Sequence, residues 1–366
     1  MPVFLDLNYH QFTNNSLDET LIKYQKNIGY LENIPSDYSV YFLAIADTNT
    51  VLKKGNIVYK FFKRSRLKKF EVPLDFHREI KKIKPDFILI HGLRYGFFST
   101  ILKKTLPKQT KILVQVHGHV TAPKGFKAMV YRFASQYIDG YIFTGKENAA
   151  SWVASNIFAR EKVFEAMEGG SIFTYDSKSE REPNSFLWVS RLTESKDPIM
   201  VIKGFSKFLN LVPTATLTMY YSTNELLNAV MIFLNENEAV KNAIHLEGYI
   251  ENNALEKVYN RHQYFIQASH FEGSGYALLE AMSCGCVPIA SKIPPFDYML
   301  NHGLETLRFE VGNLDEFYAA LVKTTSMNYN VIQNKVLAAY NDRLTFKAIA
   351  ENIINAFQSI DSKSDL

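Results

Sequence analysis

The chain has 366 residues, of which 47% are hydrophobic and 14% aromatic, and its formal net charge is +4. This composition excludes a disordered protein, and the length favours two domains over one. No apolar run is long enough to span a membrane, and the first residues do not resemble a signal peptide, so we expect a cytoplasmic protein. The two cysteines, Cys284 and Cys286, are expected to be small packing residues in a reducing compartment.

In the first half of the chain, apolar strand-like runs alternate with helical stretches, a pattern typical of parallel sheets covered by helices. Strands are expected at residues 40–45, 57–61, 86–90, 111–116 and 140–143. Helices are expected at residues 17–31, 97–106 and 123–135. These elements predict a doubly wound, Rossmann-like domain over residues 1–172.

Basic residues are concentrated in one segment of this first domain. Residues 51–111 contain 17 lysines and arginines against 4 acidic residues, and residues 61–70 interleave aromatic with basic side chains. Such a segment suits an anionic membrane surface or nucleic-acid phosphates, and the alternative is a solvated basic face without a partner. Because no nucleic-acid-binding motif accompanies the segment, we expect no nucleic acid and favour the membrane.

A second series of elements follows a polar stretch at residues 176–185, which is expected to be a linker. Strands are expected at residues 186–190, 214–220, 244–246, 264–267 and 287–290. Helices are expected at residues 198–209, 226–235, 254–260 and 276–283. We therefore expect a second Rossmann-like domain over residues 173–345, facing the first across a cleft, and a C-terminal helix over residues 346–366 that packs back on the first domain.

The most informative segment joins the strand at residues 264–267 to the helix at 276–283. Its turn contains Gly273 and Gly275 and lies between Glu272 and Glu280. The N–H groups of a first helical turn, together with the helix dipole, form an anion site. Carboxylates repel phosphate but accept hydrogen bonds from hydroxyl groups, so the segment suits a sugar nucleotide. The alternative is an ordinary turn with two solvated glutamates.

A second motif lies at the start of the second domain. Arg191 follows the strand at residues 186–190, and Lys196 lies in the loop before the next helix. Ligands of open α/β sheets bind beyond the carboxyl ends of the strands, where Arg191 is expected to project. Arginine offers phosphate a planar fork and lysine a mobile point charge, whereas the alternative is a surface loop with two solvated cations.

The strand, the E-G-S-G turn, the helix with its glutamate and the following C-G-C-V-P-I segment resemble the donor-binding signature of glycosyltransferase family four. Members of this family are retaining enzymes of the GT-B fold. The S-R-L-T-E-S-K segment is similar to the family's G-R-x-x-x-x-K element, with Ser190 in place of glycine, and Ser274 stands where the family usually has an aromatic residue. The resemblance covers about residues 185–325.

The resemblance implies roles for the matched residues. Glu280 is expected to bind the ribose hydroxyls and Glu272 the donor sugar. A His-Gly pair at residues 117–118 follows a first-domain strand where the family places one facing the donor sugar, although a lone histidine is often structural. Tyr249 lies in a segment similar to the one around the base, where it stacks or packs in the core. The expected catalytic residues are His117, Glu272, Arg191 and Lys196. The expected donor-binding residues are Glu280, Gly273, Ser274, Gly275, Tyr276, Ala277, Leu278, Tyr249, Ile250 and Gly118.

The sequence contains no Asp-x-Asp pair, the common carboxylate clamp for a divalent cation on a nucleotide diphosphate, so neither a metal site nor a cofactor is expected. The resemblance implies a retaining hexosyltransferase that uses a nucleoside-diphosphate sugar, UDP being favoured over GDP-mannose. The implied acceptor is a glycan or a lipid-linked molecule of cell-surface polysaccharide or glycolipid synthesis, and the enzyme would be peripheral on the inner membrane face if residues 61–70 bind lipid. The alternatives are a non-catalytic sugar-nucleotide-binding or scaffold protein on the same fold, and a basic nucleic-acid-binding protein.

Overall fold

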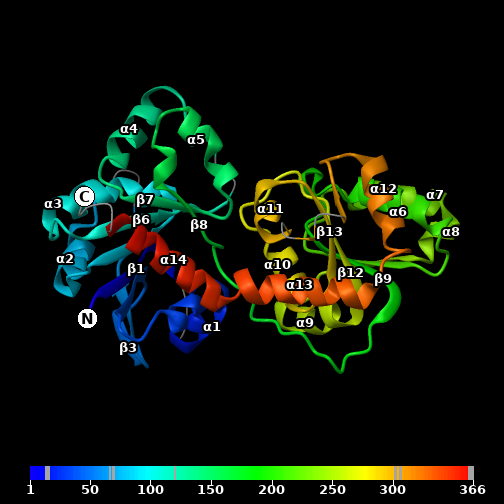
Figure 1. The fold of residues 1–366 in the computed structure, drawn as a ribbon, viewed down its shortest axis with the longest axis horizontal. Helices are drawn as coiled ribbons and strands as arrows, with labels where there is room; N and C mark the ends of the chain where they lie inside the picture. Colours follow the sequence, from blue (N-terminus) through cyan, green and yellow to red (C-terminus); the bar gives the residue numbers. More distant parts are fainter. Residues whose placement is uncertain are drawn as a thin grey trace. The chain divides into compact units, whose positions relative to one another are not determined.

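The computed structural model describes residues 1–12, 17–65, 67, 71–118, 121–300, 303–304 and 307–361. They form two compact units, shown in Figure 1. Unit 1 comprises Met1–Gly170 and Phe346–Leu366, and unit 2 comprises Ser171–Thr345. Part of the basic segment at residues 61–70, namely Arg66 and residues 68–70, lies outside the described residues.

Unit 1 is built on a sheet with the strand order β3-β4-β2-β1-β5-β6-β7-β8, in which only β3 and β4 pair antiparallel. Its strands are β1 (Val3–Phe12), β2 (Ser39–Ala46), β3 (Thr50–Lys54), β4 (Ile57–Lys63), β5 (Phe87–His91), β6 (Lys111–Gln115), β7 (Gly140–Phe143) and β8 (Val163–Glu165). Its helices are α1 (Leu17–Ile28), α2 (Leu74–Ile83), α3 (Ser99–Thr105), α4 (Gly125–Ser135), α5 (Ala150–Ala154) and α14 (Phe346–Asp361). Short 3₁₀ helices are η1 (Gly29–Asn33), η2 (Leu93–Phe98), η3 (Lys146–Ala149) and η4 (Arg160–Lys162).

The five strands predicted for unit 1 are present, but the sequence prediction missed β1, β3 and β8. The missing β1 is the central one, because it pairs with β2 on one side and with β5 on the other. The chain therefore reverses its direction of winding between β1 and β5. In an open α/β sheet this reversal opens a crevice at the carboxyl ends of the two strands, where ligands bind.

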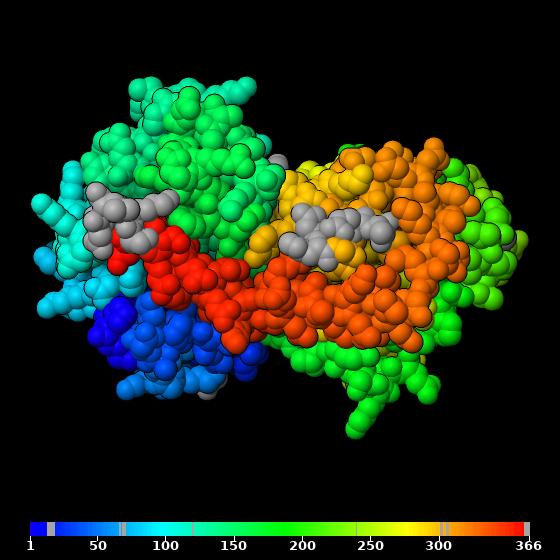
Figure 2. Space-filling model, in the orientation of Figure 1, coloured from blue at the N-terminus to red at the C-terminus, as the bar shows by residue number. Residues whose placement is uncertain are grey.

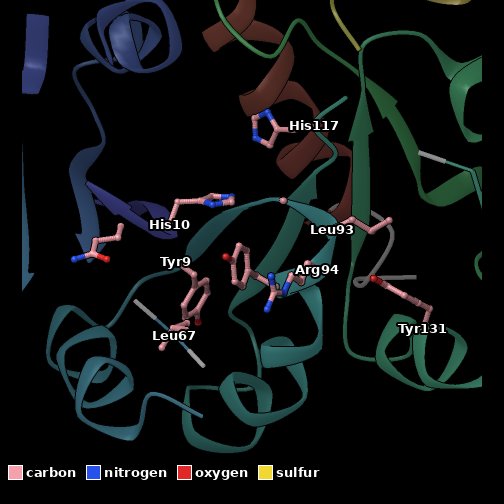
Figure 3. A pocket seen from close by; sticks show the side chains of 10 residues that line it. Tyr9, His10, Leu67, Leu93, Arg94, His117 and Tyr131 are labelled. Carbon is pink, nitrogen blue, oxygen red and sulfur yellow. The ribbon is translucent and has the colours of Figure 1, made fainter. Parts of the chain in front are cut away.

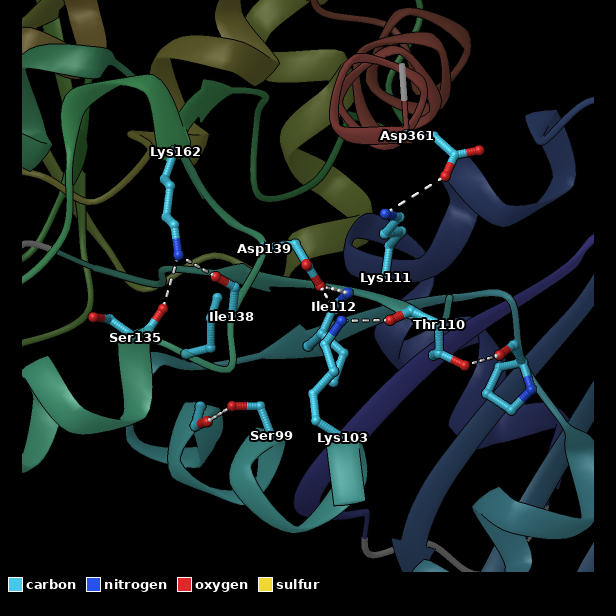
Figure 4. A network of polar contacts seen from close by, with 12 residues as sticks. Ser99, Lys103, Thr110, Lys111, Ile112, Ser135, Ile138, Asp139, Lys162 and Asp361 are labelled. Atoms are coloured by element: carbon cyan, nitrogen blue, oxygen red, sulfur yellow. Dashed lines mark hydrogen bonds and ion pairs between the residues drawn. The ribbon is translucent and has the colours of Figure 1, made fainter. Parts of the chain in front are cut away.

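The last helix, α14, packs on the sheet of unit 1. Phe357 makes edge contacts with Phe4 and a tilted contact with Phe87, at centroid distances of 5.9 and 5.0 Å. At the far end of the helix, Lys111 of β6 lies 3.6 Å from the carboxylate of Asp361 (Figure 4). These contacts place a segment from the end of the chain in the same core as β1.

Unit 2 has the strand order β11-β10-β9-β12-β13-β14, all parallel, which is the doubly wound order 3-2-1-4-5-6. Its strands are β9 (Glu182–Ser190), β10 (Thr216–Tyr221), β11 (Ile244–Gly248), β12 (His262–Gln267), β13 (Val287–Ser291) and β14 (Arg308–Phe309). Its helices are α6 (Pro198–Leu209), α7 (Leu227–Glu236), α8 (Glu238–Lys241), α9 (Asn252–Arg261), α10 (Tyr276–Ser283), α11 (Pro294–Leu300), α12 (Leu314–Lys323) and α13 (Tyr329–Arg343), with the 3₁₀ helix η5 (Glu194–Lys196). Both units are thus Rossmann-like, as predicted.

The prediction of a linker at residues 176–185 is wrong. Strand β9 begins at Glu182, inside that stretch, and the boundary between the units falls at residue 170. The residues before β9 are held on α9 and on the start of β12: the Asp176 N–H donates to Asn260 Oδ1 at 2.8 Å, and Arg181 donates to the carbonyl of His262. The polar side chains at residues 176–185 therefore serve to attach this segment to unit 2.

None of the described helices combines the length and the apolar character needed to cross a bilayer. Cys284 and Cys286 are free and buried, as their predicted packing role requires, and burial raises the pKa of both thiols.

His77 of α2 is expected to make unit 1 sensitive to acid. Burial is the main cause that lowers its pKa to about 4; Asp75 opposes this shift and Arg64 adds to it. Because the unfolded chain takes up a proton near pH 6.5 and the folded chain only near pH 4, stability falls as the pH drops through that window, by roughly 3 kcal/mol. Urea denaturation from pH 7 to pH 4 should show a flatter pH dependence for His77→Gln than for the wild type.

Exposed His245 supplies the control, since His245→Gln should leave the pH dependence unchanged. Equal slopes for His77→Gln and the wild type would contradict the assignment of this acid sensitivity to His77.

Candidate functional site

The motif residues of unit 2 meet at the reversal point of its sheet. Arg191 directly follows β9, and Glu272 lies in the turn after β12, the strand that pairs with β9. The two loops are tied together, because the His270 N–H donates to the carbonyl of Ser195 at 2.9 Å and the His270 ring lies 3.0 Å from Asp197 Oδ2. The predicted residues on these two loops are therefore brought to the same edge of the sheet.

A compact polar cluster surrounds the carboxylate of Glu272. Its Oε1 accepts hydrogen bonds from Lys196 Nζ, from Ser269 Oγ at 2.8 Å and from Gln267 Nε2 at 3.1 Å. Lys196 is buried and its pair with Glu272 is largely shielded from water, with side chains 9% and 16% exposed. Since all of these donors reach Oε1, the cluster orients the carboxylate and directs Oε2 away from them.

Two members of this cluster were not predicted from the sequence. Gln267 is the last residue of β12 and Ser269 lies two residues beyond it, and neither belongs to a motif of its own. Gln267 is 3% exposed, and among the described residues its Oε1 is a buried acceptor without a partner. A buried acceptor beside Glu272 is a feature that a ligand hydroxyl could satisfy.

The two predicted phosphate-binding cations differ in their surroundings. Lys196 is engaged by Glu272, whereas the side chain of Arg191 is exposed and forms no ion pair or hydrogen bond with any residue that the structure describes. An unengaged guanidinium keeps its whole donor fork for an anion. Arg191 is therefore the cation most accessible to a phosphate at this edge.

The turn before α10 requires glycine at position 275. Gly275 is the N-cap of α10 with φ 74°, and a Cβ at this position would lie 2.5 Å from Cε1 of Phe296. The carbonyl of Gly275 accepts from the N–H groups of Leu278 and Leu279, at 3.0 and 3.2 Å. The chain thus enters α10 at an angle that no other residue adopts without strain, and the helix begins beside Glu272.

The other predicted residues of this turn divide between surface and core. Gly273, Tyr276 and Ala277 are half-buried, Ser274 is 3% exposed and Leu278 is fully buried. Leu278 therefore belongs to the core of unit 2 rather than to an open surface. The half-buried residues remain the candidates for contact with a ligand.

Glu280 lies one helical turn further along α10 and is 5% exposed. The hydroxyl of Tyr259 donates to its Oε2 at 3.4 Å. Burial, followed by the charge of Glu280, holds the pKa of Tyr259 well above its usual value, so the phenol keeps its proton and remains a donor.

Tyr249 and Ile250 follow β11 at the same edge of the sheet. Tyr249 is 67% exposed, so the alternative in which it packs in the core is wrong. Gly248 has φ 71° and would meet no atom within 4 Å if it carried a Cβ, so its conformation, and not crowding, favours glycine.

In unit 1, His117 is part of a connected polar network. Its Nδ1 lies 3.2 Å from Glu168 Oε2 and its Nε2 lies 3.1 Å from Nδ1 of His91, while Nε2 of His91 lies 2.9 Å from Asp6 Oδ2. Gly118 joins the network, since its N–H donates to Glu168 Oε1 at 3.0 Å. The predicted His-Gly pair is thus held by a carboxylate that the sequence did not assign to it.

The network engages both ring nitrogens of each histidine. Three contacts join the two imidazoles to each other and to the carboxylates of Asp6 and Glu168. These contacts hold both rings in fixed orientations.

A pocket of about 540 Å³ opens beside His117 at the carboxyl ends of β1 and β5 (Figure 3). Basic and aromatic side chains border it, and none of the lining residues that the structure describes is acidic. The lining residues are Tyr9, His10, Gln11, Leu67, Gly92, Leu93, Arg94, Tyr95, His117 and Tyr131. In Figure 3, His117 and Leu67 lie at opposite ends of the view. The pocket thus occupies the reversal point of the sheet in unit 1.

Residues 173–342 match the family model described as Glycosyl transferases group 1. The match extends over nearly all of unit 2. It covers the Arg191 segment, the Glu272 cluster and the turn at Gly275.

Curated relatives are glycosyltransferases. The chain is 23% identical over 304 residues to the UDP-Gal:alpha-D-GlcNAc-diphosphoundecaprenol alpha-1,3-galactosyltransferase of Escherichia coli, covering 76% of this chain and 77% of that protein. It is 28% identical over 119 residues to the GtfA subunit of the UDP-N-acetylglucosamine–peptide N-acetylglucosaminyltransferase of Streptococcus pneumoniae serotype 4. That match spans 32% of this chain but only 23% of the length of GtfA.

Solved structures show the same fold over almost the whole chain. The apo form of the lipopolysaccharide outer core galactosyltransferase WaaB superposes with a TM-score of 0.63 at 15% identity, covering 98% of this chain and 99% of that one. The two Rossmann-like units of the chain therefore form a GT-B fold, as the sequence predicted.

Proposed function

We propose that this protein is a retaining glycosyltransferase that transfers a hexose from a nucleoside-diphosphate sugar to a glycan or lipid-linked acceptor. The observation that carries the proposal is the Lys196–Glu272 cluster beside exposed Arg191 and the Gly275 turn, at the reversal point of a glycosyltransferase group 1 domain. UDP is the favoured nucleotide, in line with the relatives whose names specify UDP-galactose and UDP-N-acetylglucosamine. The products would belong to cell-surface polysaccharide or glycolipid synthesis.

In this proposal unit 2 holds the donor. Arg191 and the N–H groups at the start of α10 neutralise the diphosphate, without a metal ion. Oε2 of Glu272 accepts from a hydroxyl of the sugar, and Glu280 binds the ribose. Lys196 acts mainly through Glu272, whose carboxylate it holds in place.

Transfer with retention follows a front-face attack. The bond from the anomeric carbon to the leaving phosphate oxygen breaks, the acceptor oxygen bonds to the same face of that carbon, and the departing phosphate oxygen takes the acceptor's proton. The protein contributes positioning and electrostatic stabilisation of the leaving group. His117, fixed by Glu168 and His91, faces the donor sugar in this scheme.

The acceptor is proposed to bind in the pocket of unit 1. Arg94, His10 and His117 supply donors there, while the described part of the lining includes no carboxylate. A pocket with several hydrogen-bond donors and no described carboxylate suits an acceptor that carries negative charge, such as a phosphate-bearing glycan or lipid-linked sugar.

A non-catalytic sugar-nucleotide-binding or scaffold protein is the second candidate, because a fold does not fix an activity. Thermal shifts with UDP, GDP, ADP and CDP sugars would identify the donor, since a ligand at about 100 times its dissociation constant stabilises the folded state by about 2.7 kcal/mol. Release of the nucleoside diphosphate in the presence of acceptor then separates the two candidates. If a sugar nucleotide stabilises the folded state but no acceptor in a range leads to release of the nucleoside diphosphate, the protein is not an enzyme of this kind. The binding-protein candidate is then favoured.

The two glutamates are expected to separate binding from turnover. Glu280→Gln should weaken binding of the free nucleoside diphosphate, because it removes the carboxylate proposed for the ribose. Glu272→Gln should leave that affinity unchanged and lower the turnover number. Calorimetric titration of the nucleoside diphosphate and steady-state rates would measure the two effects, and the reverse assignment would follow if only Glu272→Gln lost nucleotide affinity.

A further inference from the structure

The outer side of α4 is an apolar surface on unit 1. Phe126, Met129 and Phe133 are spaced by three and four residues, so they lie along one face of the helix, and they are 79%, 61% and 49% exposed. The opposite side of α4 is the one that packs: Tyr131 contacts the ring of buried Trp152, and Ala134 and Ser135 are buried. Figure 2 shows the blue-green segment that contains α4 at the surface of this unit.

Cations surround this apolar face. Lys124 and Lys127 are exposed at the start of α4, and Arg132 is exposed within it, where its guanidinium donates to the backbone carbonyls of Ser155 and Asn156 and keeps its charge. Arg94 is exposed on η2, a segment that packs against α4 and that also carries Phe97, which is 42% exposed. Residues 87–138 contain eight lysines and arginines and no aspartate or glutamate. The face is therefore apolar at its centre and positively charged around it.

We propose that the outer face of α4 docks on an anionic lipid bilayer. Large apolar side chains flanked by lysine and arginine match the boundary between acyl chains and anionic headgroups. A nucleic acid would gain nothing from three exposed apolar side chains, and a protein partner would have to supply both an apolar and an acidic surface. The helix reaches the interface while its inner side stays in the core of unit 1.

The basic segment at residues 61–70 is less suited to this role. Arg64 is engaged in ion pairs with Glu71 and Asp75, which neutralise its charge. The apolar residue of that segment that β4 buries, Phe61, is 4% exposed and unavailable to lipid. Among the residues of this segment that the structure describes, Arg64 and Phe61 are therefore less available to a membrane than the exposed side chains of α4.

The position of α4 also fits the acceptor. Tyr131, on the inner side of α4, lines the pocket of unit 1. If the proposed function holds, docking through α4 places that pocket beside the headgroup layer, where a lipid-linked acceptor presents its sugar. Lipid binding itself does not depend on the transfer reaction, so it is measured separately from activity.

The test is sedimentation of the full-length protein with vesicles of phosphatidylcholine alone and of phosphatidylcholine with phosphatidylglycerol. The wild type should bind the anionic vesicles and be released by salt. The variant Phe126→Ser/Met129→Ser/Phe133→Ser should bind about tenfold or more weakly, because it loses the apolar contact with the interface. Lys124→Glu/Lys127→Glu should lose at least about fivefold per residue.

Matched controls come from other exposed positions. Leu211→Ser/Met231→Ser/Ile232→Ser removes exposed apolar side chains of unit 2, and Lys53→Glu/Lys63→Glu reverses exposed charges on β3 and β4. Both should bind like the wild type. Unchanged binding by the α4 variants, or loss through Lys53 and Lys63 instead, would overturn the proposal. A wild-type protein that does not bind vesicles but dimerises through Phe126, Met129 and Phe133 would also overturn the proposal. That result would indicate an interface between two copies of the chain.

Discussion

Lys196→Ala is expected to lower the free energy of unfolding of unit 2 by about 3 kcal/mol and to abolish most of the transfer activity. The side chains of Lys196 and Glu272 are largely buried, and removing one member of such a pair leaves the other as an unpaired charge. The same change frees the carboxylate that is proposed to hold the donor sugar. Urea denaturation followed by the fluorescence of buried Trp188 would report the stability of unit 2.

A second variant separates stability from activity. Lys196→Met/Glu272→Gln removes both charges, so it should recover most of the lost stability while the transfer rate stays low. Lys292→Ala is the matched control, because Lys292 and Glu310 form an exposed ion pair at 2.8 Å that solvent screens, so its loss should change stability little. If Lys196→Ala and Lys292→Ala unfold at the same urea concentration, the Lys196–Glu272 pair has no structural role.

Arg191→Ala is expected to reduce the transfer rate by about 10²–10³ while leaving the stability of the fold unchanged. The loss reflects the removal of one preorganised donor to the developing charge of the leaving diphosphate. The unchanged stability follows from the exposure of Arg191, whose side chain no described residue engages. Arg191→Lys should also be strongly impaired, since a point charge does not reproduce a bidentate fork.

Arg261→Ala is a suitable control, because Arg261 is similarly exposed and lies at the other end of the strands, just before β12. Transfer by the wild type should survive EDTA. Loss of activity in EDTA with recovery on adding magnesium or manganese would exclude the metal-independent mechanism. A metal ion would then share with Arg191 the neutralisation of the leaving diphosphate.

The bounds of helices α6 and α10 could be predicted from the sequence, because the signals that start these helices lie close to them in the chain. Helix α6 begins where Asp197 accepts a hydrogen bond from the Met200 N–H and Pro198 occupies the first helical position. Helix α10 begins after the glycine turn at Gly275. In both cases the start signal and the apolar pattern lie within a few residues of each other, so the sequence contains all that the prediction needs.

Strand β1 shows why other elements could not be predicted. Its apolar residues alternate with Asp6, Asn8 and His10, as in a strand with one solvated face. In the folded protein Asp6 is nevertheless fully buried, because the Tyr30 hydroxyl donates to its carboxylate and Nε2 of His91 lies 2.9 Å from it. Those partners lie 24 and 85 residues away in the chain, so no local pattern indicates that this polar position belongs to the centre of the sheet.

In the candidate site, too, single residues could be predicted from local motifs, whereas the contacts between distant residues could not. The sequence identified Lys196 and Glu272 separately, each from its own motif. Their ion pair joins residues 76 positions apart, and it exists because β9 and β12 are neighbours in the sheet. Glu168 was missed as a partner of His117 for the same reason, since only the arrangement of strands brings the two together.

The return of α14 to unit 1 has a consequence for synthesis on the ribosome. Unit 2 is complete once Thr345 has emerged, whereas the core around Phe4 and Phe87 lacks Phe357 until the last helix follows. The usual order, in which the amino-terminal domain folds first, is therefore reversed for the final packing step. A chain that ended at residue 345 would hold a finished unit 2 and an open amino-terminal sheet, a species that chaperones or proteases would recognise by its exposed phenylalanines.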